Sequence, residues 1–339
     1  MRVLVTGMGG ELGTRVVNLF EHDPSVAAIC GIDGWPPRRR IHRVAFHRVE
    51  PADRRKAVAV VRDFDPEVIV HLGVYEPNAR LDPTPARLGT AASAVSVLGA
   101  AASCPSLKAI VVRSGIEVYG RRRGAPTRPD IDSELDPTTP FGTSLARVEQ
   151  VAREAGQAAG VPVTLVRCAP ILGPSFPSPV GRYLRLPVVA VNPWAELPFS
   201  LLHQEDAASA FVAAAWARHD GPVIVAGPGA VTATQAVLMG GRVPLPVVGP
   251  VWWWAGRAAQ LLGAPLPPHV AELVVRGGVA DGESGRTVLG VEPRSTRDVV
   301  EQLYRWESVA MVPVTHGRSG GRPGPRPGRR PGPAGETPA

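Results

Sequence analysis

The sequence predicts an α/β protein in which a doubly wound parallel sheet is followed by a smaller C-terminal lobe. Three observations predict this class. Short apolar runs alternate with helical patterns through the first half of the chain, as in successive βαβ units. A glycine-rich turn, TGMGGELG, joins the first apolar run to the first helical pattern. After Pro170 prolines become frequent, and strands and helices are expected to be short there.

The elements of the first half follow in a regular order. RVLVTG is expected to be the first strand, and LGTRVVNLFE the helix after it, because its apolar residues recur at helical spacing. VAAICGID and the end of VRDFDPEVIVHLG are the next expected strands, and a helix is expected over 86–102. The strand KAIVVRS, a helix over 138–159 and the strand VPVTLVRCAP complete a core assigned to residues 1–170.

The second half is expected to form a mixed lobe over 171–312 that holds the substrate, with 200–228 returning to the core. HQEDAASAFVAAAWA (203–217) predicts a helix whose acidic start suits the helix dipole, and GPVIVAG predicts a strand of the main sheet. The run Trp252–Trp254 is expected to pack inside this lobe rather than to meet a membrane surface or a partner. Residues 313–339 are rich in Gly, Pro and Arg and are expected to be a disordered tail.

The positive charge of the chain is concentrated at one end. Of the net charge of +7, the five arginines of residues 317–339 against Glu336 account for +4. Arginine outnumbers lysine throughout, so the runs at 38–40 and 121–123 are expected to be solvated loop charge rather than anion sites. No specific nucleic-acid partner is expected, although binding of nucleic acid or an acidic partner by the tail stays open as a weaker alternative.

Cysteine usage and apolar patterning indicate a cytoplasmic protein. The chain has three cysteines, an odd number spaced far apart, which is typical of a reducing compartment. No secretion signal follows Met1, and the most apolar stretch, 243–262, is interrupted by prolines and Arg257, so no membrane span is expected. No cluster of potential ligands has metal-binding spacing, and no metal is expected.

The turn TGMGGELG has the composition of a dinucleotide-binding loop of the Rossmann type. Gly7, Gly10 and Gly13 let the backbone approach a pyrophosphate, which free amide groups of Glu11 and Leu12 at the helix start would bind. Asp33 ends the second strand 20 residues beyond Gly13, where a carboxylate accepts hydrogen bonds from ribose hydroxyls. Asp33 favours NAD, while Arg38–Arg40 keep NADP open.

These motifs together resemble the extended short-chain dehydrogenase/reductase family, also called NAD-dependent epimerase/dehydratases. The resemblance extends from Met1 to about Trp306 and rests on TGMGGELG, VIVHLG, SGIEVYG and HQEDAASAF. It implies that Leu72 and Gly73 lie along the cofactor. It also implies that Glu50 takes the place of an aspartate that family members usually carry near the adenine.

The resemblance places three unusual residues where the family keeps its catalytic groups. Gly115 stands at the position of the serine or threonine, Phe141 at that of the tyrosine and Leu145 at that of the lysine. None of them can donate a proton or a positive charge, and no lysine follows Lys108. Glu117 lies where dehydratase members carry a glutamate, and it is a weak catalytic candidate together with Thr143; Ser114 and Thr143 could also bind a ligand.

Two functions therefore stay open. The favoured hypothesis is an NAD-binding protein that lacks the family's tyrosine and lysine catalysis and acts in regulation or as a scaffold. The alternative is an active nucleotide-sugar epimerase/dehydratase or small-carbonyl oxidoreductase, in which Glu117, Thr143 or water does the acid-base work. A small-molecule ligand and a homodimer are compatible with either hypothesis.

Overall fold

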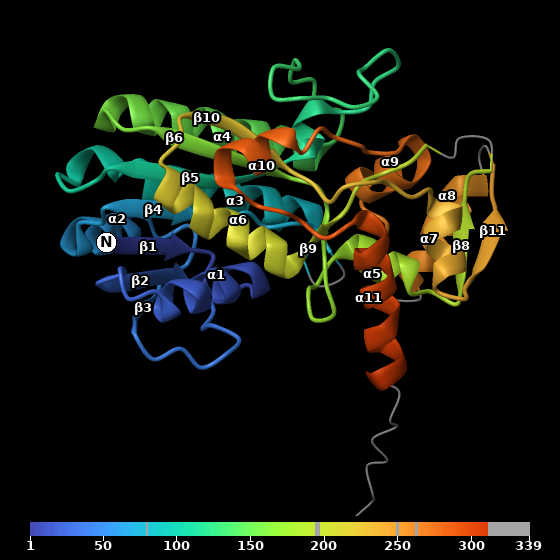
Figure 1. Cartoon of the computed structure of the whole chain (residues 1–339), viewed down its shortest axis with the longest axis horizontal. Coiled ribbons are helices and arrows are strands. Elements are labelled where there is room, and N and C mark those ends of the chain that lie inside the picture. The colour runs from blue at the N-terminus through green and yellow to red at the C-terminus, as the bar shows by residue number, and fades with distance from the viewer. Residues whose placement is uncertain (79–80, 194–196, 249–250, 262–263, 311–339) are drawn as a thin grey trace, which may run out of the picture.

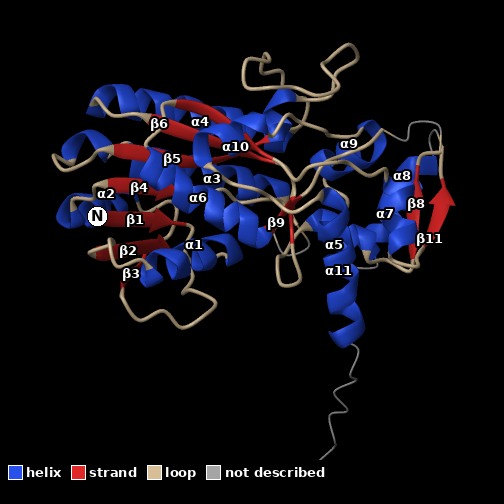
Figure 2. Ribbon diagram, in the orientation of Figure 1, coloured by secondary structure: helices blue, strands red, loops and turns tan. Residues whose placement is uncertain are grey.

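A seven-stranded parallel sheet forms one end of the molecule in the computed structural model (Figures 1 and 2). The structure describes residues 1–78, 81–193, 197–248, 251–261 and 264–310, so the prediction for the tail at 313–339 lies outside the described residues. The strands are β1 (Arg2–Thr6), β2 (Ala28–Asp33), β3 (Val44–Arg48), β4 (Val68–His71), β5 (Ala109–Gly115), β6 (Val163–Cys168) and β10 (Gly221–Val225).

The order of the strands confirms the predicted doubly wound class. It is β10-β6-β5-β4-β1-β2-β3, and every neighbouring pair is parallel. The chain winds from β1 outward to β3 and then returns to β4 beside β1 before winding the other way. Ligands of such sheets bind at the carboxyl ends of the strands next to this reversal, which here are the ends of β1 and β4.

Helices cover both faces of the sheet (Figure 2). One layer contains α1 (Glu11–His22), α6 (Gln204–Ala217) and α10 (Glu283–Leu289), and the other contains α2 (Arg54–Phe64), α3 (Pro83–Leu98) and α4 (Pro140–Ala159). Side chains alternate between the faces along each strand, so Val3 and Val5 of β1 pack in the first layer and Leu4 in the second. Two short 3-10 helices, η1 (Ala101–Ser103) and η2 (Ile116–Tyr119), flank β5.

The second half of the chain returns to complete this sheet. β10 pairs with β6, with Val223 opposite Val166, and α10 packs on β10. α6 lies against α1, and Phe211 is fully buried in their shared core. The sheet and its helix layers are therefore built from three segments of the chain, with parts of the smaller lobe between them.

The remaining residues form the smaller lobe, at the other end of the molecule (Figure 1). Its elements are α5 (Pro179–Leu184), β8 (Val188–Val191), α7 (Ala233–Met239), β11 (Val243–Pro246), α8 (Val251–Leu261), α9 (Pro268–Arg276) and α11 (Thr296–Ala310). β8 pairs with β11, and β7 (Ile171–Leu172) pairs with β9 (Leu202–His203). Tyr183 and Phe199 are the largest side chains of its buried core.

Two features differ from the expectations. The edge strand β3 was not predicted, because its side chains are mostly exposed or half-buried and show no apolar alternation. The prediction that the tryptophan run packs in the core is wrong for Trp254, whose side chain is 66% exposed; the side chains of Trp252 and Trp253 lie outside the described residues. Among the described helices, none combines the length and apolar character that crossing a bilayer requires.

Candidate functional site

The glycine loop connects β1 to α1 at the reversal point of the sheet. Gly7 has φ 70°, and a Cβ on it would lie 2.6 Å from the carbonyl oxygen of Leu72. A Cβ on Gly13 would overlap the carbonyl oxygen of Gly7. The loop can therefore close only with glycine at these two positions. Gly10 precedes α1 and provides no side-chain cap, which leaves amide groups of the first turn able to bind an anion.

Thr6 holds the end of β4 beside this loop. Its hydroxyl oxygen accepts hydrogen bonds from the amide groups of Leu72 and Gly73, each at 3.2 Å. The same hydroxyl lies 2.9 Å from Nδ1 of the buried His71, and burial lowers the pKa of His71 to about 4. His71 is thus a neutral structural group near neutral pH, and the structure brings Leu72 and Gly73 against the glycine loop.

Asp33 lies across the loop from these residues. Its carboxylate accepts hydrogen bonds from the amide groups of Gly9 and Trp35, each at 3.0 Å. Burial raises the pKa of Asp33, the two amide hydrogen bonds oppose that effect, and the nearby charge of Glu50 adds to it. The two carboxylate oxygens together offer about four acceptor sites, so sites remain for hydroxyl groups of a ligand.

Glu11 and Leu12 can contribute only backbone groups to a ligand at this loop. The Glu11 carboxylate pairs with Arg15 at 2.8 Å and accepts a hydrogen bond from Ser175 at 3.0 Å. The Leu12 side chain is buried in the core below α1. Of the arginine run 38–40, which is exposed, Arg39 approaches the same Glu11 carboxylate at 3.9 Å.

The space between the end of β5 and the start of α4 is filled by other side chains. A Cβ on Gly115 would overlap Oε2 of Glu117 and lie 3.1 Å from Cδ1 of Leu145. Leu145 is 1% exposed and Phe141 is 8% exposed, and both belong to the core under α4. The structure therefore brings together Gly115, Glu117, Phe141 and Leu145. Apolar side chains of α4 border this space, and the carboxyl group of Glu117 borders it from η2.

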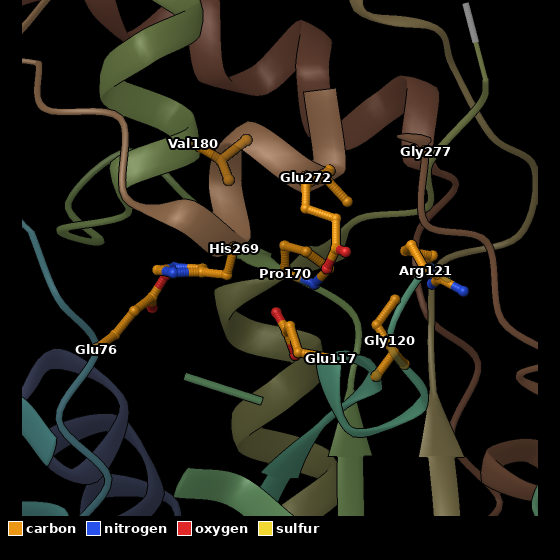
Figure 3. Close-up of a pocket in the computed structure, with 11 residues that line it drawn as sticks. Glu76, Glu117, Gly120, Arg121, Pro170, Val180, His269, Glu272 and Gly277 are labelled. Carbon is orange, nitrogen blue, oxygen red and sulfur yellow. The ribbon is translucent and has the colours of Figure 1, made fainter. Parts of the chain in front are cut away.

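Glu117 faces a small cavity at the junction of the two lobes (Figure 3). The cavity measures about 20 Å³, close to the space of one water molecule. Glu76 and His269 point toward each other at its rim, with Oε1 and Nε2 3.2 Å apart. The His269 ring also packs on Phe141, with ring centres 4.7 Å apart. Glu272 lines the opposite side and accepts a hydrogen bond from Thr138.

Removal from water raises the pKa of Glu117, and the negative charge of Glu76 adds to this effect. A charge on the His269 ring, a backbone hydrogen bond and the positive charge of Arg113 act in the opposite direction. A carboxyl group whose pKa is raised in this way can exchange a proton closer to neutral pH than an exposed glutamate.

The two hydroxyl candidates are engaged within the protein. Ser114 donates to the buried Glu149 carboxylate at 2.7 Å, and Arg167 pairs with the same carboxylate through two contacts of 2.8 Å. Thr143 donates to the carbonyl oxygen of Thr139 in the preceding turn of α4 at 3.1 Å. Both hydroxyl groups therefore have structural partners.

The structure groups the candidate residues into two neighbouring sites. The loop residues, Asp33, Glu50, Leu72 and Gly73 form the first, and Gly115, Glu117, Phe141 and Leu145 form the second. Sequence reasoning missed Glu76, His269 and Glu272, which come from distant segments and carry no local motif. The described residues contain no group of three or more His, Cys, Asp or Glu side chains arranged to hold a metal ion.

Comparisons with known proteins agree with this fold. The model of the family described as "NAD dependent epimerase/dehydratase family" matches residues 3–227. An uncharacterized protein of Mycobacterium tuberculosis is 27% identical over 307 residues, covering 87% of this chain and 80% of the relative. The crystal structure of UDP-glucose 4-epimerase from Thermotoga maritima with UDP-glucose has a TM-score of 0.70 at 16% identity, covering 91% of this chain and 99% of the other. UDP-glucuronic acid 4-epimerase from Bacillus cereus, in complex with UDP-glucuronic acid and NAD, has a TM-score of 0.71 at 17% identity, with coverages of 91% and 99%.

Proposed function

The chain belongs to the NAD-dependent epimerase/dehydratase family, and from this premise we propose that it binds NAD without the family's tyrosine and lysine catalysis, in a regulatory or scaffold role. One observation carries the proposal. The side chains that line the end of β5 from α4, Phe141 and Leu145, are buried hydrocarbon beside Gly115. An apolar surface at this place can pack against a ligand, but it cannot move a proton.

The glycine loop and Asp33 support the cofactor part of the proposal. The loop amide groups at the start of α1 would bind the pyrophosphate, and Asp33 would accept the hydrogen bonds of the adenosine ribose. A carboxylate repels a ribose phosphate, so we expect NAD to bind more tightly than NADP. When bound, the nicotinamide supplies hydride transfer, and a turnover would still require the protein to provide a proton route.

The missing proton route limits catalysis of the usual kind. General acid-base catalysis typically contributes 10²- to 10⁴-fold, or about 3 to 5 kcal/mol of barrier. Phe141, Leu145 and Gly115 have no titratable group, and the nearby hydroxyl groups of Ser114 and Thr143 already donate to protein acceptors. If proton transfer depended on the family's tyrosine and lysine alone, this chain would therefore turn over a family substrate slowly.

One observation favours the second candidate function, an active enzyme. The carboxyl group of Glu117 lies in the space that a side chain at position 115 would occupy, and its pKa is raised. Such a group could take over proton transfer with the help of the Glu76–His269 pair. In that case Glu117→Gln would abolish turnover while leaving cofactor binding unchanged.

Calorimetric titration with NAD, NADH, NADP and NADPH tests the cofactor proposal. We expect NAD or NADH to bind, and we expect Asp33→Arg to weaken that binding at least tenfold. Asp63→Arg on the exposed surface of α2 is the matched control, because it makes the same charge change away from the loop. Equal affinities of the two variants would refute the role of Asp33.

Turnover assays distinguish the two functions. UDP-glucose and UDP-glucuronic acid, the ligands named for the two structural neighbours, are the first substrates to test. The favoured proposal expects no turnover by the natural chain and at most slight activity in the double variant Phe141→Tyr/Leu145→Lys. Turnover by the natural chain that is lost in Glu117→Gln would establish the second candidate instead.

A further inference from the structure

The end of the smaller lobe that lies furthest from the main sheet exposes apolar side chains (Figure 1). Half of the large apolar side chains that are exposed among the described residues belong to four elements of this end, β8, α7, β11 and α8. They are Val188, Leu238, Val243, Leu245, Trp254 and Leu261. Exposed apolar surface that gathers in one place commonly marks a site of interaction.

The strands β8 and β11 present an apolar face to solvent. Val243 pairs with Val188, and Leu245 pairs with Ala190, and side chains at paired positions point to the same face of a sheet. The opposite face includes Val189 and is buried in the core of the lobe, where α7 packs on both strands. A sheet that rests on a core usually carries polar side chains on its other face, whereas this one carries apolar side chains there.

α8 presents a second apolar surface at the same end. Two helical turns separate Trp254 from Leu261, so both side chains point to one side of the helix. These side chains are 66% and 89% exposed, respectively. Ala259 points to the opposite side and is buried in the core of the lobe. The helix therefore turns two large apolar side chains away from the protein, which is the reverse of the usual amphipathic pattern.

The charged residues of these elements are all positive. Residues 179–193 and 229–261, which contain α5, β8, α7, β11 and α8, include no aspartate or glutamate. Their charged residues are Arg182, Arg185, Arg242 and Arg257. Arg242 directly precedes β11, and Arg257 is exposed on α8, where Asp82 from another segment lines the same cavity. The apolar surfaces are therefore combined with positive charge, and together they complement a negatively charged surface.

We propose that this apolar end, formed by α8 and by the outward face of β8 and β11, docks the protein on a membrane surface that contains anionic lipids. Large apolar side chains would enter the boundary between headgroups and acyl chains, while the arginines would attract the negative headgroups. α8 would lie in the plane of the surface. Its 11 residues span about 16 Å, roughly half of the hydrocarbon thickness of a bilayer.

A lipid surface fits these features better than a second copy of the chain. The amide groups of Val243 and Val247 donate toward β8, so the positions between them face the outer edge of β11. Among these positions, Pro244 and Pro246 have no amide hydrogen, which blocks pairing with another strand. Packing two copies face to face would bring their arginines together, with no carboxylate in these segments to balance them.

Docking at this end leaves the cofactor loop accessible. Figure 1 places α1 and the main sheet at one end of the molecule and α8 and β11 at the other. Membrane docking requires neither bound cofactor nor turnover, so it can be tested separately from the proposed function. It would hold a dinucleotide-binding domain close to a membrane.

Co-sedimentation of the full chain with vesicles tests the proposal. Vesicles of equal parts phosphatidylcholine and phosphatidylglycerol are compared with vesicles of phosphatidylcholine alone, and we expect the mixed vesicles to bind at least tenfold more tightly. Trp254→Ser and Leu261→Ser should each lower the partition coefficient about tenfold, the effect of withdrawing one large apolar side chain from lipid. Arg257→Gln should lower it about fivefold at low ionic strength.

Two variants outside the smaller lobe are the matched controls. Leu88→Ser and Arg87→Gln make the same kinds of change on the exposed surface of α3, and they should bind vesicles as the natural chain does. All the substituted side chains are exposed, so none of the changes should disturb the core. Circular dichroism spectra establish that each variant is folded.

Four results would overturn the proposal. The first is equal binding, or no binding, to the two kinds of vesicle. The second is the same partition coefficient in Trp254→Ser, Leu261→Ser and Leu88→Ser. The third is loss of binding only when the five arginines of 317–339 are replaced by glutamine. The fourth is a dimer of the natural chain in sedimentation velocity that Trp254→Ser dissociates, which would assign the apolar end to a second copy.

Discussion

At the scale of single residues, Glu117 is the titratable group with the most informative surroundings. Burial raises its pKa, so its folded-state pKa exceeds that of the unfolded chain. The stability that it contributes is therefore present at low pH and is lost as the pH rises through the folded-state pKa. Glu117→Gln stays neutral at every pH. We expect this variant to match the natural chain in acid and to have the larger free energy of unfolding above that pKa.

Urea unfolding between pH 4 and pH 9 measures this difference. Glu154→Gln, on the exposed face of α4, is the control and should follow the natural chain across the whole range. The free energies of unfolding of Glu117→Gln and of the natural chain could instead change with pH in parallel. That result would show that the pKa of Glu117 is the same in the folded and the unfolded chain.

The ion pair of Glu149 and Arg167 makes a second prediction at this scale. Both side chains are almost fully buried, and Ser114 and Tyr119 complete their hydrogen bonds. Removing Arg167 leaves the buried Glu149 carboxylate with Ser114 and with Arg153, at 3.3 Å, and breaking a buried pair of this kind typically costs about 3 to 5 kcal/mol. We expect Arg167→Met to lower the free energy of unfolding by about 3 kcal/mol, and the further change Glu149→Met to restore much of it. Urea unfolding of both variants gives the answer, and a loss below about 1 kcal/mol in Arg167→Met would contradict the prediction.

At the scale of elements, the loop between β1 and α1 offers a matched pair of substitutions. A Cβ on Gly13 would overlap the carbonyl oxygen of Gly7, whereas a Cβ on Gly10 would lie 3.3 Å from the same atom. We expect Gly13→Ala to destabilise the fold by about 1 to 3 kcal/mol, the usual cost of overpacking, and Gly10→Ala to cost less. Thermal unfolding compares the two variants, and equal losses would mean that the loop relaxes around either methyl group.

The elements also show where sequence reasoning succeeds. Every strand of the main sheet except β3 was predicted, because each is a buried apolar run next to a turn or a helical pattern. β3 carries Arg48 and His47 on an exposed edge, so burial imposes no apolar pattern on it. The cluster of Glu76 and His269 could not be predicted either, since the two residues lie 193 positions apart and meet only through the packing of the two lobes.

At the scale of the whole molecule, the two halves of the chain are joined through charged contacts as well as through the sheet. Arg15 of α1 pairs with Glu205 of α6, and it also donates to Ser175 in the loop before α5. Glu11 at the start of α1 accepts from both Arg15 and Ser175. The glycine loop is thus anchored to the second half of the chain, so cofactor binding and the arrangement of the lobes depend on the same contacts.

This arrangement predicts that residues 1–170 do not fold alone, although sequence analysis assigns the core to them. Without the second half, the sheet loses β10 and the covering helices α6 and α10, including the buried side chains of Phe211, Val223, Ile224 and Val225. At about 2 kcal/mol for each of these large apolar side chains, the loss approaches the whole stability of a typical domain. We expect the fragment 1–170 to show no cooperative urea transition by circular dichroism and to bind a hydrophobic dye, whereas the fragment 1–310 should unfold cooperatively. A single sharp transition of 1–170 would instead establish it as an independent folding unit, with the returning segment added to an already stable sheet.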